Sequence, residues 1–200
     1  MIPLVEDKWK PLVERGTEDR FLFGDKFDPD EYVKDYQKRE DFRTGVSWHI
    51  PSEDLVKKLP SFSPVLSVGS GFGYTEHLAA KRGCNIICTD ISPDQKNHWC
   101  RKGKFYMDVE KIDASKAVLK YQERNVFMAW PPYNNPMAAD VVKNMEIGRF
   151  LIYVGEGGGG CTGDEDFFSF LNSDFEEIEC IKIPSWGGIH DFAGIYKKIR

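Results

Sequence analysis

Three glycines at alternate positions, Gly69, Gly71 and Gly73, stand where a strand-forming run gives way to a segment with helical spacing. Because glycine has no Cβ, it lets the main chain turn tightly and approach a ligand closely. The pattern is typical of nucleotide sites, although a plain tight turn between a strand and a helix needs the same residues. Together with Ser70, these glycines are the first candidate ligand-binding residues.

Acidic residues follow at the ends of the next two predicted strands. Asp90 comes about twenty residues after the glycines, the spacing at which a carboxylate accepts hydrogen bonds from ribose hydroxyl groups. It also precedes Ser92 and a helical segment, so it fits a helix N-cap, and the two roles are compatible. Asp108, followed directly by Val109, suits an adenine ring, with the carboxylate on the exocyclic amine and the aliphatic side chain against the ring.

A parallel sheet would bring these residues to one edge. Apolar runs of strand length lie at residues 65–68, 85–89, 104–107, 126–129, 150–154, 179–183 and 193–196. Segments with helical spacing lie between them at residues 74–81, 93–101, 114–120, 137–144 and 165–171. The short turn at 184–188 indicates an antiparallel hairpin at the end. The expected fold is α/β, a doubly wound seven-stranded, mostly parallel sheet that ends in this hairpin, with helices on both faces.

Later turns at the same predicted edge carry side chains that can act on an acceptor molecule. Residues 130–133 (Trp-Pro-Pro-Tyr) follow a buried strand, and their aromatic rings suit a planar or cationic ligand, although simple packing explains them too. Glu156 precedes four glycines and is either a general base or a solvated loop acid. His190, beside Asp191 in the last turn, is either a proton acceptor or a local hydrogen-bonding group.

Over about residues 62 to 200, these segments resemble the class I S-adenosylmethionine-dependent methyltransferases. The likeness rests on residues 67–73, Asp90, Asp108 with Val109, and residues 130–133, in the family's order and spacing. It implies S-adenosylmethionine as cofactor, no metal, and methyl transfer to a nitrogen or oxygen nucleophile. The implied donor-binding residues are Gly69, Ser70, Gly71, Gly73, Asp90, Ile91, Asp108, Val109 and Trp130. The candidate catalytic residues are Tyr133 from this likeness and, from the loop and turn described above, Glu156 and His190.

The chain departs from that family at two positions. Ser67 stands where the family often has an acid, so hydrogen bonding around the methionine part of the donor is expected to differ. Trp130 stands where the amino-methylating branch has Asn or Asp, and an indole nitrogen only donates. A target amine would then bond to the carbonyl of Pro131 or to Asn134 and Asn135.

These departures keep two other classes of function open. The first is a non-catalytic partner subunit that binds the donor or only keeps the fold. The second is an NAD-dependent dehydrogenase, which would share the glycine turn and Asp90. The dehydrogenase gives no account of residues 130–133 or of the terminal hairpin.

Composition sets limits on organisation and partners. A chain of 200 residues, 41% hydrophobic and 14% aromatic, is long enough to bury a core without disulfides or a metal. We predict an N-terminal arm or lid over residues 1–45 and a single Rossmann-like domain over residues 46–200. The 32 acidic and 27 basic side chains give a net charge of -5, which favours a small-molecule or protein acceptor over nucleic acid.

The cysteines and the apolar segments indicate the cellular compartment. Five cysteines without paired spacing indicate neither a disulfide framework nor a zinc site. No stretch has the pattern of a signal peptide or the length of a membrane span. A cytoplasmic protein that does not engage membranes is therefore expected.

Overall fold

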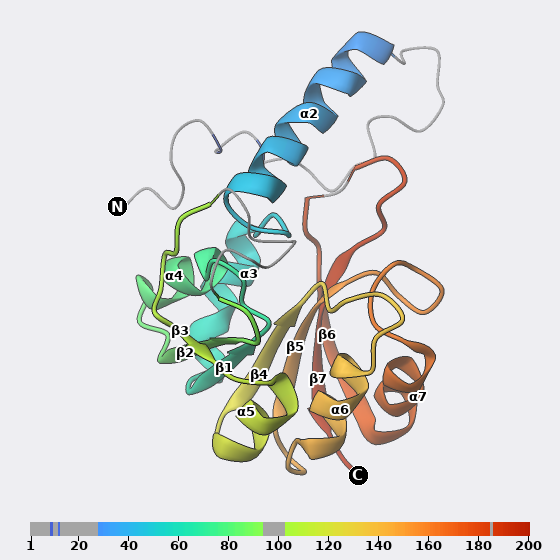
Figure 1. The fold of residues 1–200 in the computed structure, drawn as a ribbon. Helices are drawn as coiled ribbons and strands as arrows, with labels where there is room; N and C mark the ends of the chain where they lie inside the picture. The colour runs from blue at the N-terminus through green and yellow to red at the C-terminus, as the bar shows by residue number, and fades with distance from the viewer. Residues whose placement is uncertain (1–8, 10–11, 13–27, 94–102, 185) are drawn as a thin grey trace.

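Strands and helices alternate along the chain in a computed structural model that describes residues 9, 12, 28–93, 103–184 and 186–200 (Figure 1). In chain order, the elements are α2 (Pro29–Gly45), α3 (Glu53–Lys58), η1 (Leu59–Phe62), β1 (Val65–Val68), α4 (Tyr74–Ala80), β2 (Ile86–Asp90), β3 (Val109–Lys111), α5 (Ala114–Lys120), β4 (Asn125–Ala129), α6 (Met137–Asn144), β5 (Phe150–Gly155), α7 (Glu165–Asp174), β6 (Phe175–Ile181) and β7 (Phe192–Lys198).

The described strands form one seven-stranded sheet in the order β3-β2-β1-β4-β5-β7-β6. Strands β1 to β5 pair in parallel, whereas β7 lies antiparallel between β5 and β6. The predicted fold class, a mostly parallel sheet that ends in an antiparallel hairpin, is therefore confirmed.

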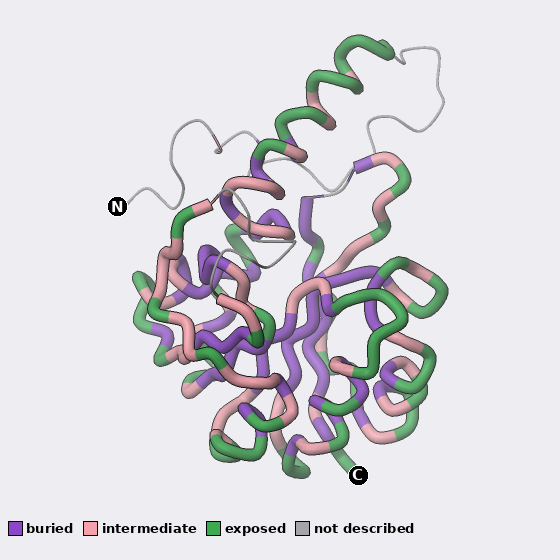
Figure 2. The backbone as a smooth tube through the Cα atoms, viewed as in Figure 1, coloured by how far each residue is buried: buried purple, intermediate pink, exposed green. Residues whose placement is uncertain are grey.

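The central strands are buried on both faces because successive side chains of a strand point to opposite sides. Val126 and Met128 of β4 pack with helices α5, α6 and α7, whereas Phe127 between them packs with α3 and α4. In β5, Leu151 likewise packs on the face covered by α5, α6 and α7, and Ile152 packs on the face covered by α3 and α4. The strands therefore form the buried centre of the molecule, between two helical layers (Figure 2).

Two helices, α5 and α6, have the bounds that the sequence predicts. Helix α5 begins where it does because the carboxylate of Asp113 accepts hydrogen bonds from the backbone N–H groups of Ser115 and Lys116, at 3.0 and 3.2 Å. Helix α7 begins as predicted, after the N-cap Asp164, and continues to residue 174 rather than 171. The helix predicted at residues 93–101 lies outside the described residues except for its first position.

The third strand lies farther along the chain than predicted, because β3 begins at residue 109 and residues 104–107 form no strand. The aromatic side chains of that segment pack against the glycine turn and the start of α4. The ring of Phe105 lies 5.6 Å from that of Phe72, and the ring of Tyr106 lies 4.8 Å from that of Tyr74. Packing of these rings therefore overrides the β propensity of the segment.

Strand β6 also differs from the prediction, since it covers residues 175–181 rather than 179–183. It is an edge strand, and its first half carries exposed Glu176 and Glu177. A register shift between Glu177 and Glu179 bends its pairing with β7. Charged side chains and a bulge protect an edge strand from pairing with another chain. Because the charged residues interrupt the apolar pattern, the first half of β6 is not predicted from the sequence.

Helix α2 extends away from the sheet, and its last turn packs against the rest of the molecule (Figure 1). Phe42 is fully buried in a cluster with Val56, Tyr74 and Trp186. The division into an arm over residues 1–45 and a domain over residues 46–200 stays a prediction. Among the described residues, no helix is long and apolar enough to cross a membrane.

A buried lysine joins the last strand to α6. The Nζ of Lys198 donates hydrogen bonds to the carbonyls of Val142, Lys143 and Met145, at 2.7, 3.0 and 2.8 Å. These carbonyls lie at the C-terminal end of α6, where a helix has no intrahelical donors for them. Lys198 therefore caps this helix from the neighbouring strand.

Replacing Lys198 with Met should lower the free energy of unfolding by about 1–3 kcal/mol, because the carbonyls lose their donor. Urea unfolding followed by circular dichroism measures the change. The matched control is Lys197→Met, at the preceding and less buried position, where a change below about 0.5 kcal/mol is expected. Equal losses in the two variants would contradict the capping role.

Candidate functional site

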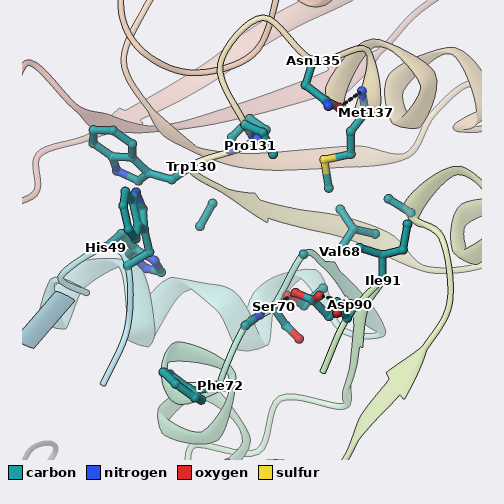
Figure 3. Close-up of a pocket in the computed structure, with 18 of the residues that line it drawn as sticks. His49, Val68, Ser70, Phe72, Asp90, Ile91, Trp130, Pro131, Asn135 and Met137 are labelled. Atoms are coloured by element: carbon teal, nitrogen blue, oxygen red, sulfur yellow. Dashed lines mark hydrogen bonds between the residues drawn. The ribbon is translucent and has the colours of Figure 1, made fainter. Parts of the chain in front are cut away.

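A cavity of about 700 Å³ opens beyond the carboxyl ends of β1, β2 and β4 (Figure 3). Strand β1 has β2 on one side and β4 on the other, so the strand order reverses here. Open α/β sheets bind their ligands at this reversal, and the volume suits a small molecule. Of the predicted donor-binding and catalytic residues, the cavity wall contains Gly69, Ser70, Gly71, Asp90, Ile91, Trp130 and Tyr133.

The turn after β1 requires glycine. Gly69 and Gly71 have φ angles of 65° and 55°, in the left-handed region that L side chains rarely adopt. The N–H of Ser70 donates to the carbonyl of Thr89 at 3.0 Å, which holds the turn on the neighbouring strand. The main chain between the two glycines therefore forms the floor of the cavity.

Gly73 has a different role from the other two glycines. It begins α4 with a φ of 71° and does not line the cavity. A Cβ at this position would lie 3.0 Å from the Cβ of Met107. The absence of a side chain at Gly73 thus makes room for the segment before β3.

Asp90 connects the glycine turn to the loop after β2. Its Oδ2 accepts a hydrogen bond from the N–H of Gly71 at 3.1 Å, and its Oδ1 accepts one from the N–H of Ser92 at 2.9 Å. The residue is 6% exposed and lines the cavity. An ionised carboxylate has about four acceptor positions, so it retains capacity for ligand hydroxyl groups.

The acidic residue that lies after β3 and lines the cavity is Asp113, not Asp108. Asp108 is exposed, Val109 begins β3, and neither residue lines the cavity. Ile112 and Asp113, directly after the strand, do line it. The pairing of an apolar residue with an acid therefore occurs at the end of β3, because the strand lies later in the chain than predicted.

An aromatic wall faces the glycine turn across the cavity (Figure 3). Trp130 has a φ of 49°, a strained conformation for a large side chain, and its Nε1 donates to Oδ2 of Asp191 at 3.1 Å. Burial raises the pKa of Asp191, and the indole hydrogen bond opposes that rise. The ring of Trp48 meets Trp130 edge to face at 6.5 Å. Trp130 therefore presents its ring, not its nitrogen, to a ligand.

Two predicted acceptors for a target amine lie in the cavity wall, and both already accept one hydrogen bond. The carbonyl of Pro131 accepts from the N–H of Gly163 at 3.2 Å. The Oδ1 of Asn135 accepts from the N–H of Met137 at 3.0 Å. Asn134 is exposed and does not line the cavity.

Glu156 and His190 lie outside the cavity wall, and Glu156 has a structural part in its loop. Its Oε2 accepts from the N–H of Cys161 at 2.7 Å, and its Oε1 accepts from the N–H of His190 at 3.0 Å. A Cβ at Gly160 would lie 2.5 Å from the Cβ of Glu156. The glycine run thus lets the loop close around a buried carboxylate, and that carboxylate joins the loop to the hairpin turn.

Replacing Glu156 with Ala should lower the free energy of unfolding by about 1–3 kcal/mol, since two partly buried backbone N–H groups lose their acceptor. Urea unfolding measures the loss. His190→Ala removes an exposed side chain but keeps the N–H, so it should stay within about 0.5 kcal/mol of the wild type. An unchanged Glu156→Ala variant would show that the two hydrogen bonds contribute nothing.

Two buried titratable residues in the cavity wall lie outside the predicted set of site residues. Glu76, in the first turn of α4, is 4% exposed and accepts a hydrogen bond from Oγ of Ser67 at 2.6 Å. His49 is buried, with its Nε2 3.0 Å from Oγ1 of Thr75, and burial lowers its pKa to about 4. Acidic residues are common in the first turn of a helix because the helix dipole stabilises a negative charge there. The sequence alone therefore does not mark Glu76 as a site residue.

Burial raises the pKa of Glu76 to about 7. Because the folded-state pKa exceeds the unfolded value, the protonated carboxyl stabilises the fold at low pH, and this contribution is lost as pH rises towards 7. Glu76→Gln should therefore raise the free energy of unfolding at about pH 8 by about 2–3 kcal/mol and have little effect at about pH 4.

Urea unfolding at the two pH values measures this difference. The matched control is Glu165→Gln, an exposed acid in the first turn of α7, for which a change below about 0.5 kcal/mol is expected at both pH values. A Glu76→Gln variant that is less stable than the wild type at the higher pH would contradict the pKa shift.

Comparison with known proteins gives matches to solved structures only. No family model matches the sequence, and no curated protein sequence matches it. Magnesium protoporphyrin IX methyltransferase from Synechocystis PCC 6803, solved with S-adenosylmethionine, is 15% identical, with a TM-score of 0.53 over 96% of this chain and 90% of that one. The N-methyltransferase NodS from Bradyrhizobium japonicum WM9, solved with S-adenosyl-L-homocysteine, is 12% identical, with a TM-score of 0.50 over 98% and 95%.

A mutant of MtNAS in complex with S-adenosylmethionine is 13% identical, with a TM-score of 0.50 over 96% of this chain and 71% of that one. At such low identities the likeness concerns the fold alone. The chain has the fold of the class I S-adenosylmethionine-dependent methyltransferases.

Proposed function

We propose that the protein is a methyltransferase that uses S-adenosylmethionine and transfers its sulfonium methyl group to a nitrogen or oxygen atom of a small-molecule or protein acceptor. The observation that carries this proposal is the charge of the cavity wall. Glu76, Asp90 and Asp113 line the cavity, and no lysine or arginine of the described residues does.

An acidic wall discriminates between the two nucleotide cofactors that share a glycine turn. S-adenosylmethionine carries a sulfonium and an ammonium group against one carboxylate, so its net charge is positive at neutral pH. NAD carries a pyrophosphate, which requires N–H donors or cationic side chains and is repelled by carboxylates. Two structural neighbours with TM-scores of 0.53 and 0.50 over nine tenths or more of each chain hold the methyl donor or its product.

In this proposal, the wall residues divide between the parts of the donor. The glycine turn with Ser70 holds the amino-acid part, and Asp90 accepts hydrogen bonds from the ribose. Ile91 and the Ile112–Asp113 pair flank the adenine. The ring of Trp130 lies towards the sulfonium, where a cation–π contact contributes roughly 0.5–2 kcal/mol.

Methyl transfer is a displacement in which the nucleophile forms a bond to the methyl carbon as the carbon–sulfur bond breaks and its electron pair returns to sulfur. A proton on the nucleophile passes to water. Such a reaction gains mainly from positioning, for which about 7–11 kcal/mol is available. Tyr133, 68% exposed at the cavity wall, is proposed to contact a planar acceptor, with the Pro131 carbonyl as its hydrogen-bond partner.

Titration calorimetry with S-adenosylmethionine and, separately, NAD tests the proposed function. We expect binding of the methyl donor only, weakened about 10- to 100-fold by Asp90→Ala, because its carboxylate holds both the ribose and the Gly71 turn. Asp108→Ala is the matched control, since this acid lies outside the cavity wall, and it should bind like the wild type. Binding of NAD without binding of S-adenosylmethionine would contradict the proposal.

A second candidate is a donor-binding partner subunit without catalysis. It is favoured by the hydrogen bonds that occupy Glu156 and the indole of Trp130, because they leave neither group free to act on an acceptor. Incubation with methyl-labelled S-adenosylmethionine and a panel of planar amines and phenols separates the two candidates. Transfer of label supports the enzyme, and donor binding without any transfer supports the subunit.

A further inference from the structure

Glu76 is a buried carboxylate in the cavity wall without a cationic partner among the described residues. It is 4% exposed, and its hydrogen bond from Ser67 comes from a neutral hydroxyl group. An unpaired buried carboxylate lowers stability, so its presence in a cavity indicates a site for a cation that binds there. The same wall holds Asp90, whose charge adds to the demand for a cation.

Ser67 and Glu76 lie together at the carboxyl end of β1. Ser67 lies on β1, and its hydroxyl group donates a hydrogen bond at 2.6 Å to the carboxylate of Glu76, which comes from α4. The two residues are brought together by the tight glycine turn between them. The carboxylate therefore reaches the same end of β1 from the helix rather than from the strand.

We propose that Glu76, held in place by Ser67, binds the ammonium group of the amino-acid part of the donor, so that this end of the cavity selects ligands that carry a protonated amine. The inference rests on the proposed function, because it assigns one end of the same cavity. It identifies Glu76 as a specificity-determining residue that a sequence pattern centred on position 67 overlooks.

The surroundings of Glu76 predict a proton release when such a ligand binds. The titratable groups that face it are Asp90 and Cys88 from β2, and His49 lines the same cavity. Burial raises the pKa of the Cys88 thiol and lowers that of His49, so both stay neutral near pH 7. With its own pKa near 7, Glu76 is about half protonated there, and a bound ammonium group stabilises the ionised form.

Calorimetry with two ligands tests the assignment. S-adenosyl-L-homocysteine carries the amino-acid group, whereas 5′-methylthioadenosine has the same nucleoside and thioether without it. We expect Glu76→Gln to weaken binding of the first ligand roughly 10- to 100-fold and to change binding of the second by less than about threefold. In the wild type at about pH 7, titration in buffers of different ionisation enthalpy should show release of about half a proton with the first ligand only.

A second variant tests the origin of the carboxylate. Adding Ser67→Asp to Glu76→Gln returns an acid to the strand and should recover most of the lost affinity for S-adenosyl-L-homocysteine. Thermal unfolding of each variant confirms that it is folded, and the wild-type proton release needs no variant at all.

The outcomes separate this inference from the proposed function. If the wild type binds neither ligand, the methyltransferase proposal fails. If the wild type binds both ligands but Glu76→Gln weakens neither, or weakens both equally, the assignment of Glu76 fails while donor binding stands. Absence of proton release with S-adenosyl-L-homocysteine also overturns the assignment.

Discussion

The cavity exists because the chain leaves β1 and β4, two neighbouring parallel strands, towards opposite faces of the sheet. After β1 it turns into α4 on one face, and after β4 it turns into α6 on the other. Crossover connections that diverge in this way leave a crevice at the carboxyl edge that no helix fills. The glycine turn, Asp90 and Trp130 line the cavity because each follows the carboxyl end of a strand at this edge.

Two carboxylates in this crevice are stabilised to different degrees. Asp90 accepts hydrogen bonds from two backbone N–H groups, whereas Glu76 accepts a side-chain hydrogen bond from one hydroxyl group. The charged form of Glu76 therefore lowers the stability of the empty protein. Functional sites commonly retain such unfavourable groups, because a ligand that supplies the missing charge recovers the lost energy on binding.

Much of the fold follows from local patterns, whereas several parts of the site depend on contacts that are distant in sequence. The N-cap Asp113 begins α5, helical spacing predicts both α5 and α6, and apolar runs predict the central strands. The position of β3 depends on aromatic packing against Phe72 and Tyr74, and its shift places Asp113 rather than Asp108 in the cavity wall. Glu76 and Glu156 each look like a surface acid until the fold shows what surrounds them.

The two halves of the cavity have different structural origins. The half near Asp90 is built from strand ends and a glycine turn, which any chain with this topology must place there. The opposite half depends on contacts between side chains that are distant in sequence. Asp191 accepts a hydrogen bond from the indole of Trp130 and interacts electrostatically with Arg39 from α2.

Those contacts extend farther along the molecule, since the guanidinium of Arg39 also lies over the ring of Trp186 at 5.5 Å. Helix α2, the hairpin turn and the aromatic wall therefore form one connected structure. A substitution in α2 that displaces Arg39 would act on the wall through Asp191, without touching the strand ends. Under the proposed function, such a substitution would alter the acceptor end of the cavity, whereas the half built from the strand ends would still hold the nucleoside.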